Sequence, residues 1–270
     1  MSEPNKTVMF PVDGHSPVHK GVYLLPNLIT TAGLFSGFYS VIASLHGDFF
    51  TAAIAILAAN VFDVLDGRIA RITKTTSRFG IEYDSLADLV AFGVAPGILV
   101  YTWALEPWGS WGWLAASLYV TCGALRLARF NVQYETTEKR HFIGLPIPAA
   151  AEVIAATVLL YYRVGDNGPT EKHFVILLVT YALGGLMVSS IKYFSFKEGG
   201  LYRRQPFWAL VAGIIIFKLL IAEPQIILFT AFALFAASGP FRLVFVLGKR
   251  FLKLRRRGRP LGPPQSSTAA

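Results

Sequence analysis

The sequence predicts an all-α integral membrane protein, and three observations support this fold class. Hydrophobic residues make up 54% of the chain and charged residues only 15%, whereas about a quarter of the residues in a soluble domain are charged. Eight apolar runs approach the roughly 20 residues that a helix needs to cross a bilayer. Basic residues are concentrated in alternate connections between these runs, as expected for a chain that crosses the membrane several times.

The apolar runs define the expected transmembrane helices. Several runs are short or interrupted, so six or seven crossings are also compatible with the sequence. In the first run, Gly33 and Gly37 lie one helical turn apart and carry no side chain, so we expect another helix to pack closely there. The runs comprise residues 23–44, 49–67, 84–104, 109–127, 147–162, 173–190, 206–221 and 224–247.

The chain is expected to form one domain with polar ends. Residues 1–20 are polar, are interrupted by Pro and Gly and lack the apolar core of a signal peptide, so we expect a disordered arm there. Residues 21–248 form the predicted transmembrane domain. Residues 249–270 begin with a basic cluster, so we expect a disordered tail that meets the anionic headgroups of membrane lipids.

The formal net charge of +9 would suit a nucleic-acid-binding protein, but the positions of the basic residues argue against that class. With eight crossings and a cytoplasmic N-terminus, the outer connections contain only Arg163 and Lys172. The positive-inside rule therefore predicts that both termini are cytoplasmic. The inner connections, by contrast, contain Arg68, Arg71, Lys74, Arg78, Arg126, Arg129, Lys139, Arg140, Lys192, Lys197, Arg203 and Arg204.

Four aspartates lie near the ends of the second and third apolar runs. Asp63 and Asp66 are three residues apart, and Asp84 and Asp88 are four residues apart, so each pair lies on one face of its helix. A short basic turn joins the two helices, so they run antiparallel and the pairs can face each other. Carboxylates within or at the edge of a membrane are costly, which marks all four as functional candidates.

Four converging carboxylates repel one another unless a cation neutralises them. Oxygen ligands suit hard cations such as Mg²⁺ or Mn²⁺, which also bridge phosphates. Small residues beside the aspartates leave room for a phosphate-bearing substrate: Gly67 and Ala70 follow the first pair by one helical turn, and Gly80 precedes Asp84 by one turn. Arg71 offers a forked donor to a phosphate.

The chain resembles the CDP-alcohol phosphotransferase family at every fixed position of its signature, which here reads Asp63-x-x-Asp66-Gly67-x-x-Ala70-Arg71, eight residues, Gly80-x-x-x-Asp84-x-x-x-Asp88. The resemblance implies a six-helix transmembrane core, to which this chain adds about two C-terminal transmembrane helices. It also implies a homodimer in the inner membrane of a prokaryote. A site for two metal ions, Mg²⁺ or Mn²⁺, is then expected to face the cytoplasm.

The resemblance further implies roles for individual residues. Asp63 and Asp84 resemble the ligands of both metals, and Asp66 resembles a ligand of the first. Asp88 resembles a ligand of the second metal and the base that takes the proton from the acceptor hydroxyl as it attacks the lipid-bearing phosphorus, with CMP leaving. The positions that resemble contacts to the CDP-lipid are Asn27, Thr30, Gly67, Ala70, Arg71, Ser77 and Gly80.

Three further segments resemble one branch of the family, the membrane-embedded phosphatidylserine synthases, which implies CDP-diacylglycerol as donor and L-serine as acceptor. They read LPNLIT at 25–30, GALRLARFNV at 123–132 and FIGLPIPAAA at 142–151. Arg126 and Arg129, three residues apart, either bind the serine carboxylate or anchor their helix to lipid phosphates. Glu152 either contacts the serine ammonium group or pairs with a neighbouring helix.

Other acceptors and another class of protein stay open at this point. Lys139 and Arg140 would suit a phosphorylated acceptor such as glycerol 3-phosphate or inositol phosphate, and choline is a further alternative. An ion- or proton-coupled transporter would also carry intramembrane aspartates, but the broken helices and internal repeats of that class are not evident. A membrane scaffold would leave the aspartate motif unexplained.

Overall fold

The structure is a computed structural model of the 270-residue chain. It describes residues 24–73, 77–136, 144–165, 168–170, 172–191, 193, 211, 213–214 and 218–257, except the side chains of 133–136 and 244–257. Within these residues the chain is helical and contains no strand, which confirms the predicted fold class. The predicted arm, most of the seventh apolar run, Lys74, Lys139 and Arg140 lie outside the described residues.

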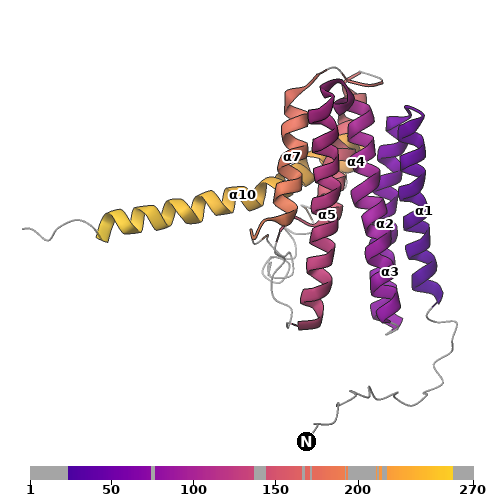
Figure 1. The fold of residues 1–270 in the computed structure, drawn as a ribbon, viewed down its shortest axis with the longest axis horizontal. Helices are drawn as coiled ribbons and strands as arrows, with labels where there is room; N and C mark the ends of the chain where they lie inside the picture. Colours follow the sequence, from indigo (N-terminus) through magenta and orange to yellow (C-terminus); the bar gives the residue numbers. More distant parts are fainter. Residues whose placement is uncertain are drawn as a thin grey trace, which may run out of the picture.

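Upright helices form a bundle, and the last helix leaves it sideways (Figure 1). The third element of the bundle is one continuous helical stretch: α3 (Arg78–Asp88), η1 (Leu89–Val94), α4 (Ala95–Val100), η2 (Tyr101–Leu105) and η3 (Glu106–Trp108). The other helices are α1 (Leu24–Leu45), α2 (Phe49–Thr73), α5 (Ser110–Thr136), α6 (Ile147–Val164), α7 (Phe174–Val188) and α10 (Pro224–Arg257).

The described helices support an integral membrane protein. Five stretches are long and apolar enough to cross a bilayer, namely Leu24–Leu45, Phe49–Thr73, Arg78–Trp108, Ile147–Val164 and Pro224–Leu243. Helix α7 is apolar but has only 15 residues. The expected runs therefore find their counterparts in the structure, apart from the seventh, which is largely outside the described residues.

The second helix is longer than its apolar run predicted. We expected a span over 49–67 and placed Arg71 and Arg78 in a connecting turn, but α2 continues to Thr73 and α3 begins at Arg78. Arginine and alanine favour helix, so the polar residues after Asp66 continue it instead of ending it. The aspartates consequently project from the interior of helices, not from their ends.

Two glycines allow α1 to approach its neighbours closely, as predicted. A Cβ atom on Gly33 would lie 3.4 Å from Cβ of Phe62 on α2. A Cβ atom on Gly37 would lie only 2.5 Å from Cα of Ala91 on η1, so a larger residue there would displace one helix. This packing holds α1, α2 and η1 together around the aspartates.

Segment η1 is a π-helix that begins directly after Asp88. Its wider hydrogen-bonding pattern is seen at Ala95, whose N–H donates to the carbonyl of Val90, five residues earlier. Side chains of this segment and of the helical turns that follow it are buried in the bundle core, including Phe92, Leu99 and Trp103. The Tyr119 hydroxyl of α5 donates to the Phe92 carbonyl at 3.0 Å, which ties α5 to this segment.

Helix α10 continues to Arg257 and so extends into the segment 249–270 that the sequence assigned to a disordered tail. It contains Pro240, which has no N–H and cannot donate to the carbonyl of Ala236. The hydroxyl of Tyr193 donates to that carbonyl instead, at 3.2 Å. An outside donor therefore compensates the helix for the hydrogen bond that the proline removes.

Candidate active site

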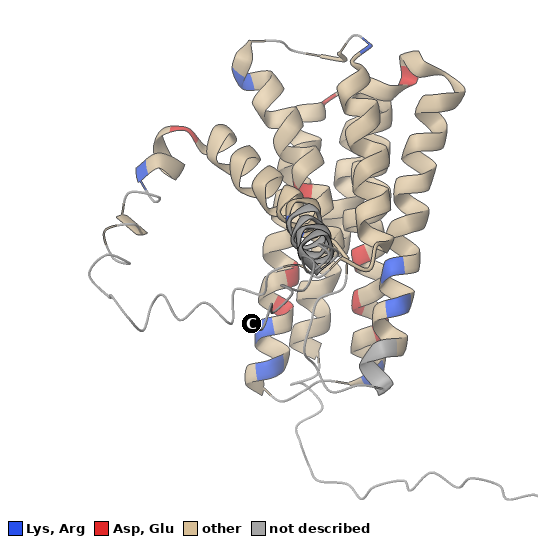
Figure 2. Ribbon diagram, turned by 90° about the vertical axis from the view of Figure 1, so that its left-hand side faces the viewer, with Lys and Arg blue, Asp and Glu red and all other residues tan. Residues whose placement is uncertain are grey.

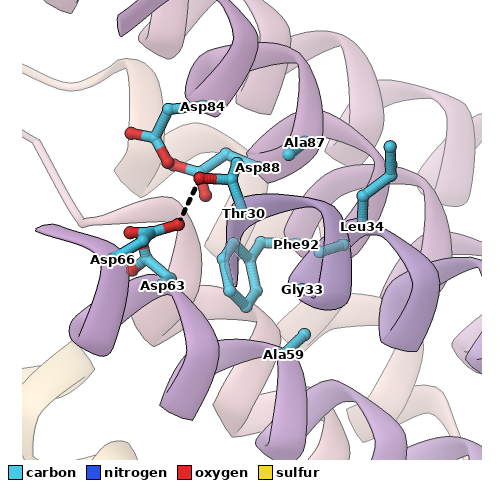
Figure 3. A pocket seen from close by; sticks show the side chains of 11 residues that line it. Thr30, Gly33, Leu34, Ala59, Asp63, Asp66, Asp84, Ala87, Asp88 and Phe92 are labelled. Carbon is cyan, nitrogen blue, oxygen red and sulfur yellow. Dashed lines mark hydrogen bonds between the residues drawn. The ribbon is translucent and has the colours of Figure 1, made fainter. Parts of the chain in front are cut away.

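The two aspartate pairs meet inside the bundle. Figure 3 shows Asp63 and Asp66 projecting from one helix, α2, towards Asp84 and Asp88 of α3. One carboxylate oxygen from each of Asp63, Asp66 and Asp84 lies within 4.8 Å of the other two. The spacing in the sequence thus predicted a convergence that the structure contains, because antiparallel helices bring the two faces together.

Asp88 lies one helical turn beyond Asp84 and lines the same pocket as the other three aspartates. The charges of these three repel the Asp88 carboxylate, whereas the charge of Arg126 attracts it. Asp88 is therefore the aspartate through which the acidic cluster meets α5. The remaining wall of the pocket comes from α1, α2 and the third helical stretch: Thr30, Gly33, Leu34, Ala59, Ala87, Ala91 and Phe92.

Thr30 supports the cluster from α1. Its hydroxyl lies 2.6 Å from Oδ2 of Asp66 and 3.1 Å from the carbonyl of Pro26, and both Thr30 and Asp66 are buried (Figure 3). A buried carboxylate that lacks a hydrogen-bond donor is costly. Thr30, which the sequence placed among the CDP-lipid contacts, is thus engaged with an aspartate in this structure.

The N-terminus of α3 lies close to α1. The Ser77 hydroxyl accepts a hydrogen bond from the Gly80 N–H at 3.0 Å and so caps the helix. A Cβ atom on Gly80 would lie 3.4 Å from Oδ1 of Asn27 and 3.1 Å from the Ser77 oxygen. The absence of a side chain at Gly80 therefore lets three predicted CDP-lipid contacts, Asn27, Ser77 and Gly80, gather at one place.

The predicted phosphate side of α2 is open. Among the described residues, a Cβ atom on Gly67 would meet only the Arg71 guanidinium, 3.8 Å away, within a 4 Å radius. Nε of Arg71 donates to the Gly67 carbonyl at 2.6 Å, and the side chain is exposed. Ala70 is half-buried on the same stretch. Small residues and one exposed guanidinium thus border the aspartates, as a phosphate site requires.

The structure separates the two arginines that the sequence grouped as serine-binding. Arg129 donates from Nη1 to the Val188 carbonyl at 3.1 Å and from Nη2 to the Ser189 carbonyl at 3.5 Å, so it satisfies the C-terminal end of α7. Arg126 is buried, its charge interacts with Asp88, and its Nε has no hydrogen-bond partner among the described residues. Arg126 thus interacts with an aspartate of the cluster, whereas Arg129 donates to the end of α7.

A second buried carboxylate stands near the cluster. Glu152 of α6 accepts a hydrogen bond from the side-chain amide of Asn60 on α2, and its charge interacts with that of Asp63. A pair between Glu152 and a neighbouring helix was one of its two predicted roles, but the partner Asn60 was not predicted. Asn60 was visible as a polar residue within an apolar run, three residues before Asp63.

The carboxylate group fits a divalent cation. Asp63, Asp66 and Asp84 supply oxygen ligands only, close enough together to share one ion, and such ligands suit hard cations. The Thr30 hydroxyl orients Asp66 from outside the group, as partners of metal ligands commonly do. The chemistry of these side chains therefore agrees with the metal site that the motif predicted.

The geometry agrees with the comparisons with known proteins. A model of the CDP-alcohol phosphatidyltransferase family matches residues 23–192, which include the four aspartates and helices α1 to α7. A CDP-diacylglycerol–serine O-phosphatidyltransferase of Helicobacter pylori strain J99 is 40% identical over 234 residues, which cover 84% of this chain and 94% of that protein.

Two further relatives extend the comparison. A CDP-diacylglycerol–serine O-phosphatidyltransferase of H. pylori strain 26695 is 45% identical over 180 residues, 66% of this chain and 74% of the relative. An archaetidylserine synthase of Methanothermobacter thermautotrophicus is 39% identical over 171 residues, 63% of this chain and 69% of the relative. The family match over residues 23–192 covers the helices that carry the site.

Proposed function

The chain belongs to the CDP-alcohol phosphatidyltransferase family, and on that premise we propose that it transfers the phosphatidyl group of CDP-diacylglycerol to L-serine. The products are phosphatidylserine and CMP. Relatives named CDP-diacylglycerol–serine O-phosphatidyltransferase support this acceptor, since one of them aligns with most of the chain. The observation that carries the proposal is the buried Arg126, whose Nε has no partner among the described residues and whose charge interacts with that of Asp88.

In the proposed reaction, Asp88 accepts the proton of the serine hydroxyl. The hydroxyl oxygen forms a bond to the phosphorus that bears diacylglycerol, and the bond from that phosphorus to the oxygen of CMP breaks. The electron pair of the broken bond leaves with CMP. Asp88 suits the base because it lies one turn beyond the three-carboxylate group and interacts with Arg126.

We assign the metal site to Asp63, Asp66, Asp84 and Asp88, with the first three as its core. Two Mg²⁺ or Mn²⁺ ions, when bound, would supply positive charge that polarises the diphosphate and offsets the charge of the leaving group. Thr30 holds the Asp66 carboxylate in place through its 2.6 Å hydrogen bond. Arg71 adds a donor to the phosphates from the open side of α2.

The nucleotide end of the CDP-lipid is proposed to lie where α1 and α3 approach, beside Asn27, Ser77 and Gly80. Gly67 and Ala70 leave space for the diphosphate on α2. Arg126 binds the serine carboxylate, because a guanidinium matches a carboxylate with two parallel hydrogen bonds. Arg129 is assigned to the end of α7 because its guanidinium donates to carbonyls there.

The active site is proposed to face the cytoplasm from the inner membrane of a bacterium. Figure 2 shows basic positions at and below the level of the central acidic positions, in the lower half of the bundle. The positive-inside rule favours the cytoplasm for that end. In a Cys122→Ala background, a single cysteine at position 74 should react with a membrane-impermeant reagent only from the inner side. We also propose a homodimer, on the family resemblance.

An acceptor panel tests the proposed function. The purified chain receives CDP-diacylglycerol, Mg²⁺ or Mn²⁺ and one acceptor at a time: serine, glycerol 3-phosphate, inositol phosphate or choline. We expect CMP release and a new phospholipid with serine, and neither product with Asp84→Asn protein. CMP release with another acceptor and none with serine would refute the serine assignment, while release with no acceptor of the panel would refute the family reaction for this chain.

A further inference from the structure

We propose that Glu152, which meets Asn60 of α2, binds the ammonium group of the amino-acid acceptor whose carboxylate Arg126 binds. This inference rests on the proposed function and deepens it, because it makes recognition of the acceptor two-sided. A carboxylate and an ammonium group together define an α-amino acid, and each requires an opposite charge in a site from which water is largely excluded. Arg126 alone would admit any small hydroxy acid.

Glu152 is buried where α6 meets α2. It lies in α6 between small apolar residues such as Ala151 and Ala155, and it is only 3% exposed. Intramembrane carboxylates are rare and generally face a partner or a functional site. Glu152 meets α2 next to the aspartates, since Asn60 donates to it and Asp63 interacts with its charge.

Glu152 has no cationic partner in the part of the chain that the structure describes. Among the described residues it receives one amide hydrogen bond, from Asn60, and no cation lies within ion-pair distance. Its charged neighbour is Asp63, which has the same sign. A buried carboxylate between an amide and another carboxylate is incompletely compensated, so a cationic ligand would complete the site.

Arg126 is the buried group of opposite charge near the same aspartates. Its guanidinium, 8% exposed and with no partner for Nε among the described residues, interacts with Asp88 from α5, whereas Glu152 interacts with Asp63 from α6. Asp63 and Asp88 line the same pocket. One buried negative group and one buried positive group therefore interact with the aspartates of this pocket, and a zwitterion with a hydroxyl group carries the two complementary charges.

The competing role for Glu152 is a clamp that joins α6 to α2 through Asn60. Two variants separate the roles, because each keeps one feature and removes the other. Glu152→Gln keeps a side-chain carbonyl that accepts from Asn60 but removes the charge. Asn60→Ala keeps the carboxylate but removes the clamp.

The experiment measures the KM values for serine and for 3-hydroxypropionate, which is serine without its ammonium group. For Glu152→Gln we expect the serine KM to rise by about 10- to 150-fold, the range for loss of a hydrogen bond to a charged group. The KM values for 3-hydroxypropionate and CDP-diacylglycerol should stay near those of the parent. Asn60→Ala should change both acceptors alike and lower the melting temperature.

An unchanged preference for serine over 3-hydroxypropionate in Glu152→Gln would overturn the inference. The inference would also be overturned if Asn60→Ala lost this preference as strongly as Glu152→Gln. If Glu152→Gln fails to fold, Glu152→Asp serves instead. It retains the charge and should retain the preference for serine over 3-hydroxypropionate even at reduced turnover. Loss of that preference in Glu152→Asp would contradict the inference. Absence of serine-dependent CMP release from the parent chain overturns the proposed function itself, which distinguishes the two failures.

Discussion

Two parts of the site are built in different ways. In the first, α2 and α3 contribute the aspartates from a single stretch between Asp63 and Asp88, and Thr30 of α1 supports them. In the second, α5 and α6 contribute one charged residue each, Arg126 and Glu152, from separate parts of the chain. We call these the aspartate side and the α5–α6 side. The proposed chemistry is thus encoded locally, whereas the proposed recognition of the acceptor depends on how distant helices pack.

Asp88→Asn tests the aspartate side and should have the largest effect. Asparagine cannot accept the proton of the acceptor hydroxyl, so turnover should fall by about 10²- to 10⁴-fold while some CDP-lipid binding remains. CMP release and CDP-lipid binding are measured on the same preparation. Glu82→Gln is the matched control, because Glu82 is an exposed carboxylate on the same helix. Near-normal turnover of Asp88→Asn with metal bound would show that another group is the base.

Arg126→Lys tests the α5–α6 side, with Arg129→Lys as its control. Lysine keeps the charge of Arg126 but loses the fork, so the KM for serine should rise by about 10- to 150-fold. Serinamide, which lacks the carboxylate, should be discriminated against strongly by the parent and weakly by Arg126→Lys. Arg129→Lys should instead lower the melting temperature, because Arg129 donates to the end of α7. If both substitutions changed serine and serinamide alike, neither arginine would read the carboxylate.

Thr30→Val sharpens the comparison on the aspartate side by removing one hydroxyl. Asp66 loses its 2.6 Å donor, so the Mg²⁺ or Mn²⁺ concentration that gives half-maximal activity should rise by about tenfold. The serine KM should be unaffected. Thr31→Val is the control, because the Thr31 hydroxyl contacts the Tyr83 hydroxyl at 2.9 Å on an exposed part of the same helix. An unchanged metal requirement in Thr30→Val would mean that Asp66 needs no support from α1.

Glu223→Gln should have the smallest effect. Glu223 and Arg163 form an ion pair with an N–O distance of 2.9 Å, but both side chains are substantially exposed, at 40% and 51%. Exposed pairs are screened by water and salt, so turnover should stay within about twofold of the parent and the melting temperature should barely move. A large loss of activity would mean that the junction of α6 and α10 affects the site. The buried pair Asn60–Glu152 is better placed to have such an effect.

The aspartate side could be predicted from the sequence because its residues recur at helical spacing. Three of the four aspartates bring their carboxylate oxygens close together, as expected. Gly33 and Gly37 let neighbouring helices pack closely, also as expected. The three-residue spacing of Arg126 and Arg129 suggested one shared role, but their side chains reach different partners. Periodicity specifies which face a residue occupies; it does not specify which helix that face will meet.

Other features depended on contacts between distant segments. The Asn60–Glu152 pair joins residues of α2 and α6, and no spacing rule links them. The same holds for Tyr193, which supplies the donor that Pro240 removes from α10. The end of α2 was predicted too early because the apolar run stops before the helix does, and helix propensity continues through the arginines.

The π-helical segment that follows Asp88 makes chain length a determinant of function. Such a segment holds an additional residue compared with regular α-helix, as the Ala95-to-Val90 hydrogen bond indicates. The wide turn absorbs this residue because it winds less per residue than an α-helix, so deleting one residue between 89 and 94 should restore regular winding and leave Asp84 and Asp88 facing Asp63 and Asp66. One residue more, without a second wide turn to absorb it, would turn α3 by about 100° relative to α4 and swing Asp84 and Asp88 away, although every proposed catalytic side chain would still be present. Insertions should therefore be purged from this segment during evolution more strictly than apolar substitutions that preserve its length.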